Sequence, residues 1–122
     1  MLLSKLKSLA LFAAICLPTT FLEPPVQAAT CTGASHYGLG DGYHGQITAS
    51  GEVFNTYALT TAHRTLPFGT RLKVTRGNKS VIVRVTDRGP FVGGRGLDLS
   101  YAAFSKLAPP SYGHIDVCYS VI

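Results

Sequence analysis

The sequence predicts a mostly β protein, a small closed barrel of about six short strands with one helix. Three observations carry this prediction: the chain has 122 residues with 13 glycines, its clearest pattern is a period-two alternation over residues 70–86, and no long helical stretch follows the N-terminus. Only 14% of the residues are charged and 46% are hydrophobic. These values exclude a disordered polyelectrolyte and a membrane protein with many spans.

The first 28 residues have the pattern of a secretory signal. Lys5 and Lys7 precede the apolar run Leu9–Leu17, and prolines and small residues follow it. The run is too short to cross a bilayer, which takes about 20 residues, although an uncleaved anchor is the alternative. We therefore expect an exported protein, periplasmic or extracellular, with a single domain over residues 29–122 and no stable membrane span after signal cleavage.

Cysteine usage agrees with export. Cys16 leaves with the signal, and Ile15 stands where lipid attachment needs a small residue, so a lipoprotein is not expected. Cys31 and Cys118 remain, 87 positions apart at the two ends of the domain. In an oxidising compartment they predict one disulfide; two unpaired thiols are the alternative. Metal binding by this pair is disfavoured because no CxxC or HxxxH spacing is present.

The charge of the mature chain is mildly basic. Removing the signal takes two lysines and one glutamate from 11 basic and 6 acidic residues, which leaves nine and five, a net charge of +4. Such a surface attracts polyanions such as cell-wall material. Nucleic acid is not an expected partner because the chain is exported and has no dense basic tract.

The first half of the domain predicts short elements between glycine-rich loops. Residues 31–37 suit an edge strand, residues 38–51 form a long loop with five glycines, and residues 58–63 are a short strand or turn. The alternation of residues 70–86 on both sides of Gly77-Asn78 predicts a hairpin.

The second half predicts a loop, a helix and a last strand. A second glycine-rich loop, DRGPFVGGRG, precedes Leu97-Asp98-Leu99. Ser100 can cap a helix over residues 101–107, which Pro109-Pro110 ends. Residues 114–122 form the last strand.

Acid–base chemistry by carboxylates is the main catalytic option. The mature chain has no GxSxG motif and no phosphate-binding glycine loop. Its five carboxylates are Asp41, Glu52, Asp87, Asp98 and Asp116. Glycoside cleavage needs little more than a protonated carboxyl group and stabilisation of an oxocarbenium-like centre.

Three of these acids and one histidine are candidates, and each has an ordinary structural alternative. Glu52 can serve a turn, Asp87 can pair with Arg88, and Asp98 can bond backbone donors near the helix start. His63, in TAHR, can be a satisfied core or surface residue. Spacing alone does not decide between these readings.

The motifs TASGE, TAHRTLPFGT and DRGPF–GRGLDLS, in this order over residues 34–107, strongly resemble the RlpA-like family of double-psi β-barrel proteins. Its members are exported bacterial proteins, and characterised ones are lytic transglycosylases on peptidoglycan; expansins and barwin-like proteins are more distantly similar. The resemblance implies a six-stranded double-psi barrel with one or two short helices. It also implies a groove that gathers Glu52, His63, Asp87 and Asp98.

One departure from the family concerns the aromatic platform for sugars. His36 stands where the family has Trp in its ASWYG stretch, and the chain has no Trp. Tyr37, Tyr43 and Phe91 remain as candidates to stack on sugar rings. Three arginines are candidate partners for anionic lactyl or peptide groups, or solvated surface residues: Arg64, Arg88 and Arg95.

The leading hypothesis is an endolytic lytic transglycosylase acting on peptidoglycan glycan strands. Asp87 would be the general acid, its conjugate base or Glu52 would deprotonate the muramyl 6-hydroxyl, and His63 would orient one carboxylate. The product would be a 1,6-anhydromuramyl end, and no metal or organic cofactor is expected. The alternative is a non-catalytic, expansin-like module that binds cell-wall carbohydrate.

Overall fold

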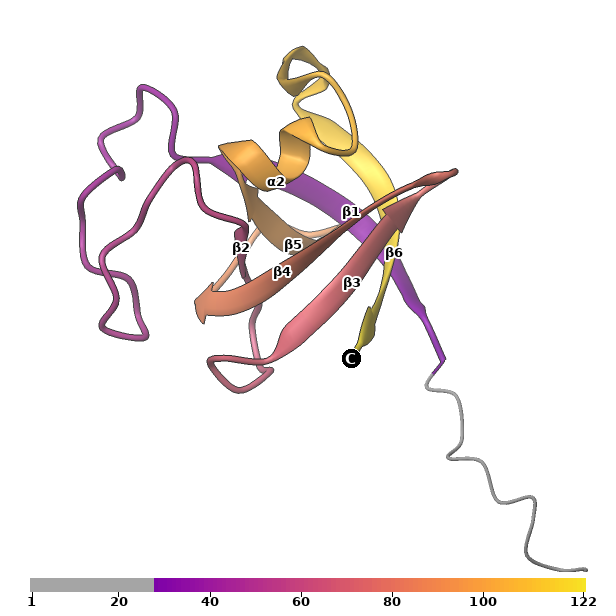
Figure 1. Ribbon diagram of the computed structural model, residues 1–122, viewed down its shortest axis with the longest axis horizontal. Helices are drawn as coiled ribbons and strands as arrows, with labels where there is room; N and C mark the ends of the chain where they lie inside the picture. Colours follow the sequence, from indigo (N-terminus) through magenta and orange to yellow (C-terminus); the bar gives the residue numbers. More distant parts are fainter. Residues whose placement is uncertain (1–27) are drawn as a thin grey trace, which may run out of the picture.

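The computed structural model describes residues 28–122, so the predicted signal lies outside the described residues except for its last position. Six strands close into one barrel in the order β1-β5-β2-β4-β3-β6, as predicted (Figure 1). The strands are β1 Thr30–Tyr37, β2 Thr60–Ala62, β3 Arg71–Arg76, β4 Lys79–Asp87, β5 Arg95–Ser100 and β6 His114–Val121. Within residues 28–122, no helix is long and apolar enough to cross a membrane.

The barrel mixes parallel and antiparallel pairs. β1 pairs with β5, and β2 with β4, in parallel, while the other four neighbouring pairs are antiparallel. The predicted hairpin is β3–β4, and its first loop residue, Gly77, has the positive φ of 61° that a two-residue hairpin loop favours there. The prediction of an edge strand over residues 31–37 was wrong, because barrel closure pairs β1 on both sides.

The core follows from strand alternation. Leu72 and Val74 of β3 are fully buried, as are Leu97 and Leu99 of β5, while Lys73 and Asp98 between them are more exposed. On β4, Val81, Val83 and Val85 form the matching inward stripe: Val83 and Val85 are at most 1% exposed and Val81 is 7% exposed. Because successive side chains alternate across a strand, Arg84 and Thr86 face out of the barrel wall.

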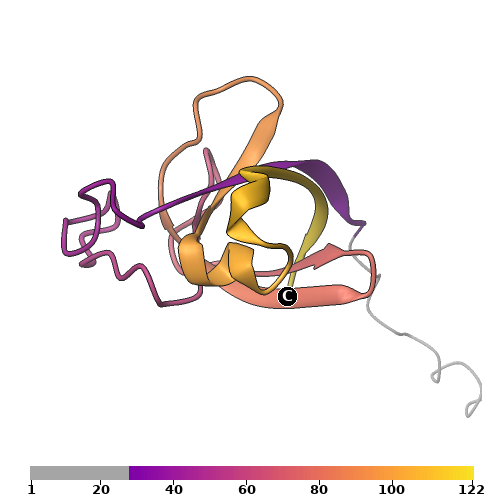
Figure 2. The same ribbon diagram turned by 90° about the horizontal axis from the view of Figure 1, so that it is seen from above.

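The helix α2, Tyr101–Ser105, lies over one end of the barrel (Figure 2). Ser100 caps it as predicted, since its Oγ accepts a hydrogen bond from Ala103 N at 3.1 Å. The helix ends two residues earlier than expected; turn hydrogen bonds, such as Leu107 N to the Phe104 carbonyl, continue the chain. A 3-10 turn, η2 Pro110–Tyr112, then leads into β6.

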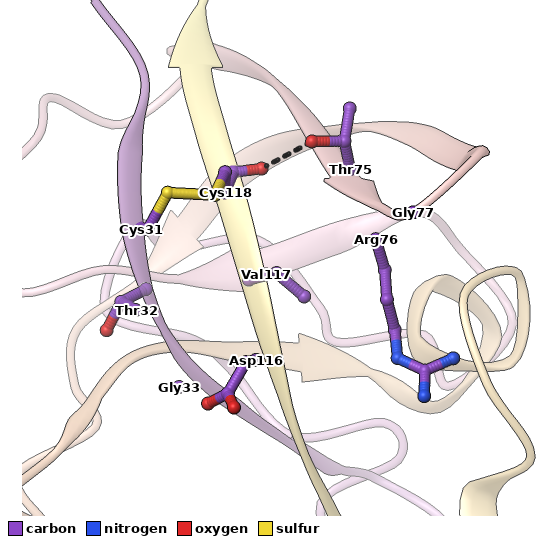
Figure 3. Close-up of a pocket in the computed structure, with 9 residues that line it drawn as sticks. All are labelled: Cys31, Thr32, Gly33, Thr75, Arg76, Gly77, Asp116, Val117 and Cys118. Atoms are coloured by element: carbon purple, nitrogen blue, oxygen red, sulfur yellow. Dashed lines mark hydrogen bonds between the residues drawn. A yellow bond between two sulfur atoms is a disulfide. The ribbon is translucent and has the colours of Figure 1, made fainter.

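The predicted disulfide joins Cys31 of β1 to Cys118 of β6, which face each other across the antiparallel pair with Cα atoms 3.9 Å apart. A recess of about 380 Å³ lies beside it (Figure 3). Arg76 and Asp116 border this recess, and Thr75 Oγ1 donates to the Cys118 carbonyl at 3.2 Å. It shares no lining residue with the cleft that Asp87 and Asp98 line, so we assign it no part in the chemistry.

Candidate active site

Two aspartates lie on either side of one alanine in the barrel wall. Ala62 of β2 is the register partner of Asp98 on β5 and of Asp87 on β4. Neighbouring strands are about 4.8 Å apart, so the two aspartate Cα atoms are separated by about 10 Å. The sheet register thus brings together two residues that are distant from Ala62 in sequence.

A β-bulge sets this alignment. Thr61 pairs with Val85 but the next residue, Ala62, pairs with Asp87, so Thr86 is an extra residue on β4. Bulges re-aim side chains and are frequent next to active sites. Here the bulge places Asp87, and not Thr86, level with Ala62 and Asp98.

Both aspartates line one cleft of about 390 Å³. The cleft lies where β2, β4 and β5 meet the two glycine-rich loops. Its other lining residues are aromatic, small or part of the loop after β4: Tyr37, Tyr43, Ala62, Arg88, Gly89, Pro90, Phe91 and Val92.

Asp87 is held by three donors. The backbone N–H groups of Ala49 and Arg88 each donate to its Oδ1 at 3.0 Å, and the Tyr37 hydroxyl donates to Oδ2 at 3.1 Å. Burial and the neighbouring Asp87 raise the pKa of Tyr37, so the phenol keeps its proton and remains a donor. The two carboxylate oxygens of Asp87 thus accept hydrogen bonds from three different segments of the chain.

Asp98 has a different environment. It accepts one side-chain hydrogen bond, from Ser35 Oγ at 3.1 Å, and its side chain is only partly open to solvent. Burial raises the pKa of Asp98, and the Ser35 hydrogen bond offsets part of this effect. Asp98 therefore retains a proton at higher pH than an exposed aspartate does.

Aromatic side chains form one wall of the cleft. Tyr37 stacks on Phe54 with ring centroids 4.6 Å apart, and Tyr43 meets Tyr37 edge-on at 5.5 Å. Phe91 is 81% exposed at the cleft. His36, at the position of the family's Trp, packs instead against Phe104 at 4.6 Å, so it adds no platform to the cleft.

Glu52 does not line the cleft. Its carboxylate makes a two-pronged ion pair with Arg84 of β4, one prong of which is 3.0 Å long. Hydrogen bonding from Arg84 lowers the pKa of Glu52, so the carboxylate is ionised. Both side chains border a separate recess beside β4.

His63 also points away from the cleft. Its Nδ1 accepts hydrogen bonds from the backbone N–H groups of Thr65 and Leu66, each at 3.0 Å, so Nε2 carries the proton and donates to the Tyr119 hydroxyl at 2.9 Å. Its own backbone N–H donates to the Asp87 carbonyl at 3.1 Å. The ring thus fixes the turn over residues 63–66, which follows β2. The backbone N–H of His63 in this turn binds the carbonyl at the end of β4.

Burial, with Arg88 and Arg64 nearby, lowers the pKa of His63 from 6.5. The unfolded chain therefore binds more protons than the folded chain below about pH 6.5, and the free energy of unfolding should fall as the pH drops from there toward the folded pKa. We expect a His63→Gln variant to lose less stability over this interval than the native chain. Urea unfolding at pH 7.5 and 5.5 measures the difference, and equal losses in both proteins would contradict it.

The three arginines expected to bind anions are engaged differently. The Arg64 guanidinium donates to the backbone carbonyls of Pro90, Val92 and Arg95 at 2.6–3.2 Å. Arg88 donates to the His63 carbonyl at 3.1 Å and lies 3.9 Å from the centroid of the Phe68 ring. Arg95 is half-buried on β5 and does not line the cleft of the two aspartates. Arg64 and Arg88 thus brace the loops around the cleft.

The sequence hypothesis did not name three residues that shape the site: Ser35, Ala62 and Arg84. Alternation along β4 already indicates that Arg84 faces outward, but its partner Glu52 is 32 residues away. Ser35 lies in the stretch where the family has ASWYG, and Ala62 lies in TAHRTLPFGT, yet their place beside the aspartates depends on register between distant strands.

The barrel and its cleft place the protein in the class of double-psi β-barrel proteins, here with a cleft lined by acidic and aromatic residues. Residues 29–119 match the model of the family described as lytic transglycolase, and the chain belongs to this family. It is 54% identical over 91 residues to a probable endolytic peptidoglycan transglycosylase RlpA of Synechocystis sp., covering 73% of this chain and 28% of that protein. For the endolytic peptidoglycan transglycosylase RlpA of Vibrio cholerae the identity is 46%, covering 73% and 34%. The chain thus spans about a third or less of these curated relatives.

Solved structures share the barrel. An expansin of Clavibacter michiganensis is 27% identical with a TM-score of 0.63, covering 78% of this chain and 50% of that one. A Streptomyces papain inhibitor is 21% identical with a TM-score of 0.65, covering 82% of this chain and 99% of that one, and it is similar in fold alone.

Proposed function

We propose that this domain is an endolytic transglycosylase that cleaves the linkage between N-acetylmuramic acid and N-acetylglucosamine in peptidoglycan glycan strands. The names of the relatives support the substrate. The observation that carries the proposal is the placement of Asp87 and Asp98 on either side of Ala62 in one aromatic-lined cleft. Because the disulfide suits an oxidising compartment, we place the activity outside the cytoplasm.

In this proposal Asp98 is the general acid, a role that the sequence hypothesis gave to Asp87. Burial raises the pKa of Asp98, as a proton donor near neutral pH requires. The oxygens of Asp87 already accept three hydrogen bonds. Asp87 is therefore better suited to face the positive charge that develops at the sugar ring.

The reaction then needs no water. Asp98 gives its proton to the bridging oxygen, and the bond from this oxygen to the muramyl anomeric carbon breaks. The resulting Asp98 carboxylate takes the proton from the muramyl 6-hydroxyl, whose oxygen closes on the anomeric carbon. The products are a free glucosaminyl end and a 1,6-anhydromuramyl end, and Asp98 is again protonated.

Glu52 and His63 have positioning roles in this proposal. The Glu52–Arg84 pair joins the loop over residues 48–52 to β4, and Ala49 in that loop donates to Asp87. The ring of His63 fixes the turn that follows β2, and the backbone N–H of His63 donates to the Asp87 carbonyl. Both residues thus act on the position of Asp87.

Digestion of purified peptidoglycan tests the proposal. Mass analysis should find muropeptides that are one water lighter than hydrolysis products, because a 1,6-anhydro ring replaces the reducing end. The structural likeness to an expansin favours one alternative, a domain that binds wall glycan without cutting it. Binding to sacculi with no anhydromuropeptide release would favour that alternative and reject the enzyme.

Phe91 should contribute to substrate affinity. It is 81% exposed at the cleft, and the loss of one aromatic stacking contact costs about 0.5–1.5 kcal/mol, so Phe91→Ala should raise KM about 2- to 13-fold with little change in kcat. Tyr112→Ala is the matched control, since Tyr112 is an exposed aromatic that lines no part of the cleft. Steady-state kinetics on soluble glycan fragments gives both constants. An unchanged KM for Phe91→Ala would exclude this contact.

A further inference from the structure

Arg64 binds the backbone of the loop that joins β4 to β5, residues 88–94. Its Nε donates to the Pro90 carbonyl at 2.6 Å, and its Nη2 donates to the carbonyls of Val92 and Arg95 at 3.2 and 2.9 Å. One side chain thus contacts three points along the loop and its junction with β5. The guanidinium edge formed by Nε and Nη2 is fully used, so this edge has no donors left for the carboxylate of a ligand.

Packing contributes little to the position of the loop tip. Phe91 and Val92 are 81% and 53% exposed, and the two glycines that follow them are exposed as well. The turn hydrogen bond from Arg95 N to the Val92 carbonyl is 3.4 Å long, beyond the usual range of about 2.7–3.2 Å. The position of the tip therefore depends on the carbonyl groups that Arg64 binds.

Arg64 extends from a fixed base. The Nδ1 atom of His63 accepts hydrogen bonds from the backbone N–H groups of Thr65 and Leu66, so the turn is held on both sides of Arg64. Arg64 is not among the residues that line the cleft. Any effect of Arg64 on a glycan in the cleft therefore passes through the loop.

The loop brings Phe91 and Val92 to the cleft, which both of them line. A ring that is 81% exposed can stack on a sugar only where its backbone holds it. A loop that is already ordered also loses less conformational entropy when a ligand binds. The hydrogen bonds of Arg64 supply this order in the free protein.

We propose that Arg64 is a positioning residue for Phe91: by binding three carbonyl groups, it holds the ring as a preformed stacking surface for a sugar of the glycan strand. The identification of the ligand as glycan rests on the proposed function. Arg64 thereby contributes to substrate affinity without touching the substrate, instead of pairing with anionic lactyl or peptide groups. Lysine is a poor replacement, because a single Nζ lacks the planar array of donors.

A double-mutant cycle with Arg64→Met and Phe91→Ala, measured on soluble glycan fragments, tests the proposal. Methionine keeps an unbranched side chain and removes the donors. Because Arg64 acts through Phe91, Arg64→Met should raise KM by no more than Phe91→Ala does, about 2- to 13-fold, with little change in kcat. In the Phe91→Ala background the same substitution should change KM by less than about 2-fold.

Two further variants complete the cycle. Arg64→Lys should raise KM nearly as much as Arg64→Met, and it supplies the same readouts if the methionine variant does not fold. Arg71→Met is the matched control, since Arg71 is an exposed arginine of β3 that does not line the cleft, and it should leave both constants unchanged. Equal increases in KM with and without Phe91, or a fall in kcat, would overturn the proposal.

Backbone ¹⁵N relaxation of the free protein tests the loop without any substrate. Order parameters of residues 91–94 should be near 0.85, about the value of rigid backbone, in the native chain and fall below about 0.6 in Arg64→Met, while those of residues 97–100 stay unchanged. Unchanged order in the loop would reject the positioning role and keep the enzyme. Loss of order, and of sacculus binding, in a protein that releases no anhydromuropeptides would reject the enzyme and keep the positioning role.

Discussion

Replacing Asp98 by asparagine should reduce the release of 1,6-anhydromuropeptides about 10²- to 10⁴-fold, the usual contribution of a positioned general acid. Asparagine has nearly the same shape and can keep the hydrogen bond with Ser35 Oγ, so the barrel should unfold at a similar temperature. It has no proton to give to the bridging oxygen, however. Sacculus binding should therefore persist while turnover is lost.

Two further variants locate the acid. Asp116→Asn is the matched control, because Asp116 is an exposed aspartate of β6 that lines the recess beside the disulfide and not the cleft. Asp87→Asn should lower activity by disturbing the hydrogen bonds from Ala49, Arg88 and Tyr37. The remaining activity of this variant should still fall at high pH, where the general acid Asp98 loses its proton. If Asp98→Asn stays active and Asp87→Asn no longer loses activity at high pH, the general acid is Asp87, as the sequence hypothesis proposed.

Local features of the fold were predictable because short-range chemistry determines them. The hairpin follows from alternation around Gly77-Asn78, and the start of α2 follows from Ser100, whose hydroxyl caps it. The disulfide followed from compartment and count, since only Cys31 and Cys118 remain after the predicted signal. Closure of the sheet was predictable as a way to avoid exposed edges, but the position of β1 within it was not.

The site itself depends on long-range register that alternation does not encode. Ala62 lies between the two aspartates only because β2 pairs with β4 in parallel and with β5 antiparallel, and a bulge shifts β4 by one residue. The family resemblance implied that Glu52 and His63 share one groove with the aspartates, whereas their side chains bond to Arg84 and Tyr119. The sequence offered a turn role for Glu52 and a satisfied core or surface role for His63 as alternatives, but it could not show which cavity each side chain enters.

Removal of the disulfide should have the largest effect on stability. Cys31 and Cys118 close a loop with a sequence separation of 87, for which the chain-entropy model gives about 4.6 kcal/mol. This is a large share of the stability of a small domain, about 5–15 kcal/mol. The double variant Cys31→Ser, Cys118→Ser should therefore unfold at much lower urea concentration than the oxidised native chain.

Reduction of the native chain provides the matched comparison, since it opens the same loop without a substitution. Reducing agent should shift the urea midpoint of the native chain close to that of the serine variant and leave the variant unchanged. Because the disulfide joins β1 to β6, and the cleft is lined from other strands and from the far end of β1, the folded variant should keep its activity at low temperature. A loss of less than about 1 kcal/mol would contradict this prediction and would mean that residual structure in the unfolded chain already keeps its two ends close without the covalent link.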